Sequence, residues 1–167
     1  MIKDILIHHS RNGELTLESI RTVKQVEYEL KPSGIWFSPQ LENGKSEWET
    51  WVNESGCGFD GNPHQIVLRS DSNLLSIETV EDLKRLDREY SENVYSLMKV
   101  INWQKISQDY DGLLVSNYHQ IKYQIGTELT KHLWFYALDV NGGCVWNPQA
   151  IGTEMCIRDS PTILVTF

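Results

Sequence analysis

The stretch of sequence that decides the fold reads KPSGIWFSPQLENGKSEWETW and runs from residue 31 to residue 51. Its segment GIWFS, residues 34–38, is short, rich in aromatic and β-branched residues, and follows Pro and Gly, which predicts a β-strand. The residues after it are expected to form a helix that carries Trp48 and Trp51. Several tryptophans beside a few polar groups favour a site that holds a flat, apolar ligand. The alternative, and the better interpretation for any one aromatic residue, is that these tryptophans belong to the core.

Length and composition predict a single domain. The chain has 167 residues, of which 40% are apolar and 23% charged, an ordinary composition for a soluble globular protein with a core of its own. Its net charge of −8 disfavours a dedicated surface for duplex nucleic acid, which is normally basic. No apolar run has the length of a membrane span, and the N-terminus lacks the pattern of a signal peptide. Cys57, Cys144 and Cys156 lack the spacing of metal ligands, so a reduced, cytoplasmic protein without a metal is expected.

The C-terminal residues 154–167 are set apart from the predicted domain. Their segment EMCIRDS, residues 154–160, resembles the translation of an adapter used in sequencing libraries. The domain is therefore predicted to span residues 1–153, and the tail is predicted to contribute nothing to its fold. The alternative is a real C-terminal strand over residues 162–167, which its β-branched content would allow.

Hydrophobic periodicity and turn-forming residues predict the remaining elements. Strands are expected at residues 2–9, 65–69, 74–77, 113–115 and 133–139. Helices are expected at residues 16–28, from a cap at Thr79 through Tyr90, and at residues 101–110. Residues 55–62 should form a flexible Gly-rich connection, and residues 117–130 a polar excursion over the sheet. The turn at residues 141–143 should join the strand at 133–139 to residues 144–146 in a β-hairpin.

These elements predict an α+β fold, with a mixed, mainly antiparallel split sheet flanked by helices. Their alternation is too irregular, and the hairpin too plain, for a doubly wound parallel sheet. On the first strand, the adjacent His8 and His9 should point to opposite faces, so they are not expected to act as one metal pair. One of them should face the cleft; the alternative is a histidine tied to the backbone at a sheet edge.

Two segments resemble the ADP-ribosyltransferase superfamily, in its branch of poly-ADP-ribose polymerases and diphtheria-toxin-like enzymes. In that family a first strand ends in His-Gly-Ser, and a later strand reads Gly-Ile-Tyr-Phe-Ala before a helix with a Lys-Ser pair and an aromatic residue. Here the first strand reads ILIHHS, residues 5–10, the second reads GIWFS, and Lys45-Ser46 precedes Trp48. His9 stands in place of the family's glycine and Trp36 in place of its tyrosine, and the family's glutamate has no obvious counterpart. The chain also resembles a group of uncharacterised phage and bacterial proteins that share the KPxG-hydrophobic-aromatic-x-Ser pattern.

The resemblance implies a split-sheet fold that binds NAD, as a substrate, in the cleft between two half-sheets. It implies that His8 orients the ribose, that Trp36 and Trp48 stack on the nicotinamide ring, and that Ser46 bonds the nicotinamide amide. The expected NAD-binding residues are His8, Ser10, Trp36, Ser38, Ser46 and Trp48.

The implied activity is that of a mono-ADP-ribosyltransferase, which moves ADP-ribose from NAD to a macromolecular acceptor, a protein or a nucleic acid, and releases nicotinamide. Its transition state resembles an oxocarbenium ion and calls for a carboxylate near the ribose. Asp139 and Asp111, both at ends of expected strands, are the candidates, and a solvated turn aspartate is the alternative for each. The expected catalytic residues are His8, Trp36 and Asp139.

A second class of function stays open. The chain can instead be a non-catalytic module of the same fold, such as a phage accessory protein, that binds a nucleotide or a partner protein through the Trp-rich cleft. A carboxylate facing the ribose would favour the enzyme. The sequence shows no nucleophile motif of a serine or cysteine hydrolase, and its five histidines form no metal-binding constellation.

Overall fold

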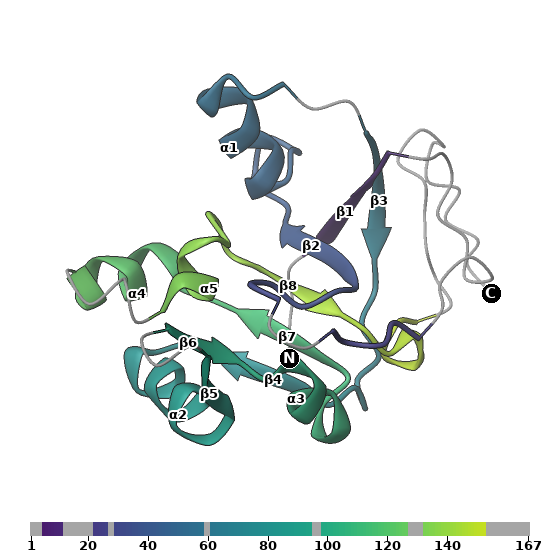
Figure 1. Ribbon diagram of the computed structural model, residues 1–167. Coiled ribbons are helices and arrows are strands. Elements are labelled where there is room, and N and C mark those ends of the chain that lie inside the picture. The colour runs from purple at the N-terminus through teal and green to yellow at the C-terminus, as the bar shows by residue number, and fades with distance from the viewer. Residues whose placement is uncertain are drawn as a thin grey trace.

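The computed structural model describes residues 5–11, 22–26, 29–58, 61–94, 98–126 and 132–152, and they form an α+β fold (Figure 1). The strands are β1 (Leu6–Ser10), β2 (Ile35–Pro39), β3 (Asn62–Ile66), β4 (Leu74–Ile77), β5 (Ser91–Val94), β6 (Met98–Ile101), β7 (Gly112–Val115) and β8 (Gly142–Val145). The helices are α1 (Glu47–Ser55), α2 (Val80–Tyr90), α3 (Trp103–Asp109), α4 (Tyr118–Ile125) and α5 (Leu133–Tyr136), and a 3-10 helix follows at Pro148–Ala150. None of the helices in these ranges is long and apolar enough to cross a membrane.

Six strands form one mixed sheet in the order β3-β1-β2-β8-β7-β4. Within the described chain, β4 and β7 pair in parallel, and the other four pairings of this sheet are antiparallel. The prediction of a mixed, mainly antiparallel sheet in an α+β fold is thus confirmed. Figure 1 shows β1 and β3 running steeply across the direction of β8, β7 and β4, with β2 between the two groups.

The sheet buries apolar side chains on both faces, because successive residues of a strand point to opposite sides. Along β8, Cys144 joins the larger core and Val145 the smaller one. The larger core lies under α2, α3, α4 and α5 and contains the fully buried side chains of Trp103, Tyr118 and Phe135. The smaller core contains Leu6, Phe37, Ile66, Val145, Ala150 and Ile151.

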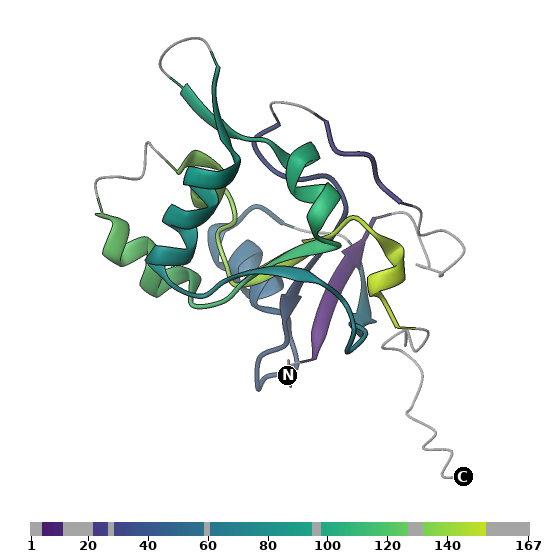
Figure 2. The same cartoon turned by 90° about the horizontal axis from the view of Figure 1, so that it is seen from below.

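The helix α2 begins where the sequence predicts. The Thr79 hydroxyl accepts a hydrogen bond from the Asp82 N–H, and the Asp82 carboxylate accepts one from the Thr79 N–H, which is a capping box. Leu83, Leu86 and Tyr90 are buried along one face. The helix then leads directly into the β5–β6 hairpin, which is not among the elements predicted from the sequence. Figure 2 shows this hairpin extending from the body of the protein.

The predicted strand at residues 133–139 is wrong, because residues Leu133–Tyr136 form α5. The adjacent side chains of Trp134 and Phe135 both enter the larger core, where Trp134 packs edge-on against Trp103 at 5.3 Å between ring centroids. A strand would direct two adjacent side chains to opposite faces, whereas a helix allows both to be buried together. The predicted hairpin is therefore wrong as well, since β8 pairs with β2 and β7.

The polar excursion predicted at residues 117–130 contains the helix α4. Tyr118, Ile121 and Ile125 are buried at a helical spacing, and this pattern was present in the sequence. The helix predicted at residues 16–28 falls mostly outside the described residues, and residues 22–26 have no helical structure. The tail at residues 154–167 lies outside the described residues.

Candidate functional site

The candidate site lies where β1 parts from β2. The two strands pair only at Leu6↔Pro39 and Ile7↔Ser38, and from His8 onward β1 continues to pair with β3 alone. Meanwhile Trp36 and Phe37 of β2 pair with β8 on the other side. The sheet therefore opens at this point, and residues from both diverging strands face the gap.

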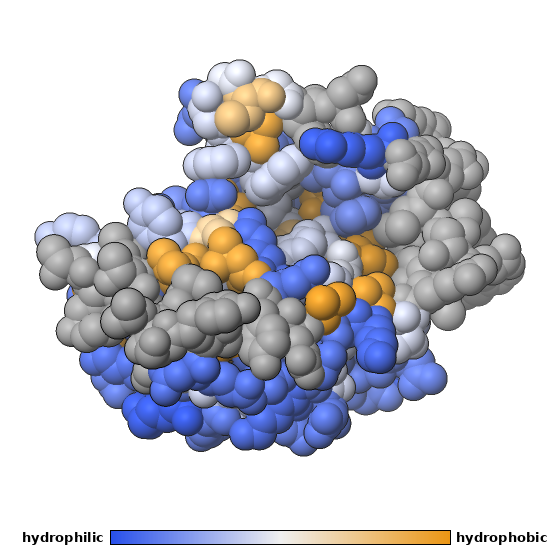
Figure 3. All heavy atoms as spheres, viewed as in Figure 1, coloured by the Kyte–Doolittle hydropathy of each residue, from blue (hydrophilic) through white to orange (hydrophobic). Residues whose placement is uncertain are grey.

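A cavity of about 280 Å³ occupies this region. Its volume is close to the lower end of the range typical of small-molecule sites. Figure 3 shows the surface hollowed below α1. The helix α1 and the strands β1 and β2 all contribute lining residues to the cavity. The lining residues are Ile7, His8, His9, Lys31, Trp36, Phe37, Ser38, Trp48, Leu138, Val140, Asn141, Gly142 and Gly143.

The side chain of His8 is held by the backbone of β2, the strand from which β1 has diverged. Its Nδ1 lies 2.6 Å from the main-chain carbonyl oxygen of Trp36. Burial lowers the pKa of His8 below its ordinary value, the bond to the Trp36 carbonyl opposes this, and the nearby His64 lowers the pKa further. The side chain of His8 is therefore held as a neutral imidazole, with its ring orientation set by Trp36.

His9 also borders the cavity, although it neighbours His8 on one strand. Its Nε2 lies 2.8 Å from the Ser46 hydroxyl oxygen, and its ring centroid lies 5.5 Å from that of Trp48. Adjacent strand residues point to opposite sides, yet both reach this cavity because it sits in the opening between the strands. The expectation that only one of the two histidines would face the cleft is wrong.

The indole of Trp36 forms an aromatic wall of the cavity. Its Nε1–H donates to the Pro32 carbonyl oxygen at 3.2 Å, which fixes the ring. The Lys31 ammonium lies 5.6 Å from the ring centroid, at the distance of a cation–π contact. Burial lowers the pKa of Lys31, and the charge of Asp139 opposes this effect.

Two glycines supply a wall of bare backbone. A Cβ atom on Gly143 would lie 2.2 Å from the Leu113 carbonyl oxygen and 2.6 Å from the Phe37 ring. A Cβ atom on Gly142 would lie 2.3 Å from the Phe37 carbonyl oxygen. Glycine is therefore required at both positions for β8 to pack between β2 and β7.

The serines predicted for the site occupy different places. Ser38 lines the cavity, and its hydroxyl accepts a hydrogen bond from the Trp48 N–H at 3.2 Å. Ser46 is fully buried as the N-cap of α1, accepting from the Glu49 N–H at 3.0 Å, and is not among the lining residues. Ser10 ends β1 opposite Asn62 and is likewise not among them.

The candidate carboxylates lie outside the cavity wall. Asp139 is placed between the lining residues Leu138 and Val140, in a left-handed backbone conformation (φ 70°). The carboxylate of Asp111 instead connects the segments that carry Asn73 and Asn147. It accepts a hydrogen bond from the Asn73 N–H at 3.0 Å and one from Asn147 Nδ2 at 2.6 Å. No Asp or Glu is among the described residues that line the cavity.

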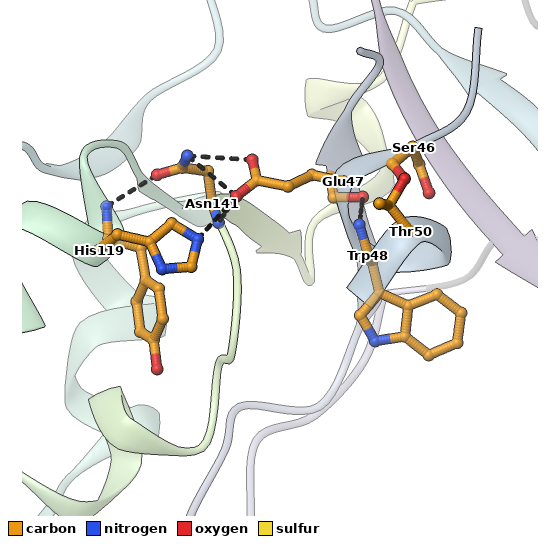
Figure 4. Close-up of polar contacts among 8 residues, drawn as sticks. Ser46, Glu47, Trp48, Thr50, His119 and Asn141 are labelled. Atoms are coloured by element: carbon orange, nitrogen blue, oxygen red, sulfur yellow. Dashed lines mark hydrogen bonds and ion pairs between the residues drawn. The ribbon is translucent and has the colours of Figure 1, made fainter. Parts of the chain in front are cut away.

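Glu47 is a carboxylate near the cavity that is not among the site residues predicted from the sequence. From the first turn of α1 it accepts hydrogen bonds from the backbone and side-chain N–H groups of Asn141, and its Oε1 lies 3.2 Å from His119 Nε2 (Figure 4). Asn141 itself lines the cavity. The bridge thus ties α1 to the turn before β8, and no local signal could have indicated a contact between residues so distant in sequence.

The structure thus brings His8, Trp36, Ser38 and Trp48 together on one cavity, and Asp139 lies in sequence between two of its lining residues, Leu138 and Val140. In the described part of the chain, no group of three or more His, Cys, Asp or Glu side chains could hold a metal ion. Comparison of the chain with protein-family models, with curated proteins and with solved structures finds no match.

Proposed function

We propose that this cavity binds the nicotinamide end of NAD and that the protein is a mono-ADP-ribosyltransferase. The observation that carries the proposal is the joint placement of His8 and Trp36 on one cavity at the point where β1 leaves β2. The resemblance of these two strands to the ADP-ribosyltransferase superfamily assigns the same two positions to NAD. The divergence of the strands supports a split-sheet arrangement of the kind found in that superfamily.

The lining of the cavity suits a flat ring with a polar edge. The indoles of Trp36 and Trp48 offer aromatic faces, and Gly142 and Gly143 also line the cavity. With its Nδ1–H donated to Trp36, the neutral imidazole of His8 has Nε2 left as an acceptor for a ribose hydroxyl. These features provide stacking for nicotinamide and one directional hydrogen bond for the sugar.

The proposed reaction breaks the bond between the nicotinamide nitrogen and C1′ of the ribose. Nicotinamide leaves with the bonding electron pair, C1′ passes through an oxocarbenium-like state, and a nucleophile on the acceptor forms the new bond and gives up its proton. A carboxylate near the sugar would stabilise the developing positive charge. We assign this role to Asp139, because it lies between two lining residues, whereas Asp111 is engaged with Asn73 and Asn147.

The second candidate function is a binding module of the same shape without catalytic activity. It is favoured by one observation, the absence of Asp and Glu from the described lining residues. Such a module would bind NAD or another nucleotide without cleaving it.

Nicotinamide release from NAD labelled in the nicotinamide ring tests the enzyme and separates it from the module. Water can serve as the acceptor, so the assay needs no knowledge of the natural target. We expect release by the wild-type protein, a fall of about 100-fold or more in Asp139→Asn, and no change in Asp71→Asn, which alters an exposed aspartate paired with Arg69. Trp36→Ala should weaken NAD binding by about 1–2 kcal/mol. Binding of NAD to folded wild-type protein without release would establish the module, and no binding at millimolar NAD would reject both the enzyme and a module that binds NAD.

A further inference from the structure

Lys31 is the one lysine or arginine among the described residues that line the cavity. Its side chain is half-buried and lies against the ring of Trp36. Within the described part of the chain, its ammonium group makes no hydrogen bond and no ion pair, although the protein carries 23 acidic and 15 basic residues. A half-buried ammonium group without an ion pair would be stabilised by a bound anion.

This placement conflicts with a simple view of nicotinamide binding. The nicotinamide ring of NAD is itself a cation, and stacking on Trp36 inside the cavity would bring it close to the Lys31 ammonium, which also lines the cavity and lies 5.6 Å from the centroid of that indole. Two cations cannot share one aromatic face without repulsion. Binding of the ring is therefore favoured when the Lys31 ammonium has an anionic partner.

The environment of Lys31 indicates what that partner is. Burial makes its charge less favourable than in water, and the charge of Asp139 offsets this only in part, without forming an ion pair. A ligand anion that reaches Nζ would supply the missing partner. A lysine is a common binder of phosphate, to which it gives a charge-assisted hydrogen bond.

We propose that Lys31 binds a phosphate of the ligand, so that the site takes a nucleotide whose flat ring lies on Trp36 and whose phosphate lies one sugar away. The inference rests on the proposed function for the stacked ring, and it adds the phosphate as the second point of recognition. When the phosphate draws Nζ from the indole, the aromatic face becomes free for the cationic ring. The cavity then discriminates nucleotides from the corresponding nucleosides.

Isothermal titration calorimetry with nicotinamide mononucleotide and nicotinamide riboside tests this inference, because the two ligands differ only by the phosphate. We expect wild-type protein to bind the mononucleotide about tenfold more tightly, a preference that declines with added salt. Lys31→Met should abolish the preference, and Lys31→Arg should retain much of it. Lys45→Met is the matched control, since Lys45 is exposed, pairs with Glu49 and is not a lining residue. Melting temperatures of all variants show that each is folded.

Two further ligands, nicotinamide and ADP, separate this inference from the proposed function. Equal affinity of the wild-type protein for mononucleotide and riboside, or an unchanged preference in Lys31→Met, overturns the phosphate role and leaves the nicotinamide site standing. Binding of ADP that depends on Lys31, without binding of nicotinamide or its riboside, supports the phosphate role and rejects the nicotinamide site. Failure of all four ligands to bind the folded protein overturns both.

Discussion

The Nδ1 atom of His8 lies 2.6 Å from the main-chain carbonyl oxygen of Trp36, so a side chain joins the two strands where their pairing has ended. The carbonyl can only accept, which places the proton on Nδ1 and leaves Nε2 as an acceptor. This bond couples the opening of the sheet to the orientation of the imidazole. It also joins two residues to which we assign roles in binding.

The first prediction concerns the protonation of His8. Its pKa is lowered from the ordinary value of 6.5 mainly by burial, so the unfolded chain binds more protons than the folded protein between the lowered pKa and 6.5. The contribution of His8 to stability is therefore present above pH 6.5 and is lost as the pH falls toward the lowered pKa. We expect wild-type protein to lose more stability than His8→Asn between about pH 7.5 and pH 5. Asn keeps a donor near the position of Nδ1. An equal change in the free energy of urea unfolding between these two pH values in both proteins would contradict the prediction.

The second prediction concerns Ser46 as the cap of α1. Ser46→Ala removes both the acceptor for the Glu49 N–H and the contact with His9 Nε2, and should lower the free energy of unfolding by about 1–2 kcal/mol. Ser46→Asn should restore most of this loss, because Asn is also a good N-cap. Ser55→Ala, at the exposed C-terminal end of the same helix, is the matched control and should have little effect. Equal losses in Ser46→Ala and Ser55→Ala would show that the cap contributes little.

The third prediction concerns the contact between His132 Nδ1 and the Asp87 carboxylate. Only 7% of the His132 side chain and 13% of the Asp87 side chain are exposed. Because His132→Ala would leave the Asp87 carboxylate buried without this partner, it should cost about 3–5 kcal/mol of stability. The double variant Asp87→Ala/His132→Ala should cost less than the sum of the single variants.

The control for this pair is the exposed contact between Arg85 and Asp82. Arg85→Ala should cost at most about 1 kcal/mol, because water and salt screen exposed charges. Additive losses for Asp87→Ala and His132→Ala in chemical denaturation would contradict a coupled buried pair.

The fourth prediction concerns the C-terminal residues 154–167. The Gly152 N–H donates to the Val67 carbonyl oxygen at 2.7 Å, and Ile151 is buried beside Ala150 in the smaller core. Deleting residues 154–167 should therefore leave the melting temperature unchanged within about 2 °C, whereas deleting residues 148–167 should lower it by several degrees. A large fall in the first deletion would show that the adapter-like segment contributes to the folded structure.

Local sequence determined the elements whose signals lie within a few residues. The strand β2, the helix α1 and the capping box of α2 all occur where turn formers, side-chain caps and hydrophobic spacing predict them. Such signals are sufficient because a cap or a hydrophobic stripe depends on neighbours three or four residues away. For the same reason, the buried positions of α4 could have been predicted from their spacing.

The tertiary structure alone decided the rest. The run at residues 133–139 is apolar and aromatic, and a short run of this kind fits a strand or a buried helix equally well. It forms α5 because Trp134 and Phe135 both find space in the core beside Trp103. That space is created by distant segments, so no local pattern could specify it.

The candidate site divides in the same way. The sequence by itself placed His8 at the end of one strand and Trp36 within another, and it indicated an aromatic-rich site. Only the folded chain decided that β1 leaves β2 after Ile7, that Lys31 lies over Trp36, and that Ser46 caps α1 behind the lining residue His9. Strand pairing and cavity shape depend on contacts between segments that are far apart in sequence, 28 residues for His8 and Trp36 and 94 for Glu47 and Asn141. Packing of the whole domain sets these contacts, because each strand can satisfy its backbone hydrogen bonds with more than one partner.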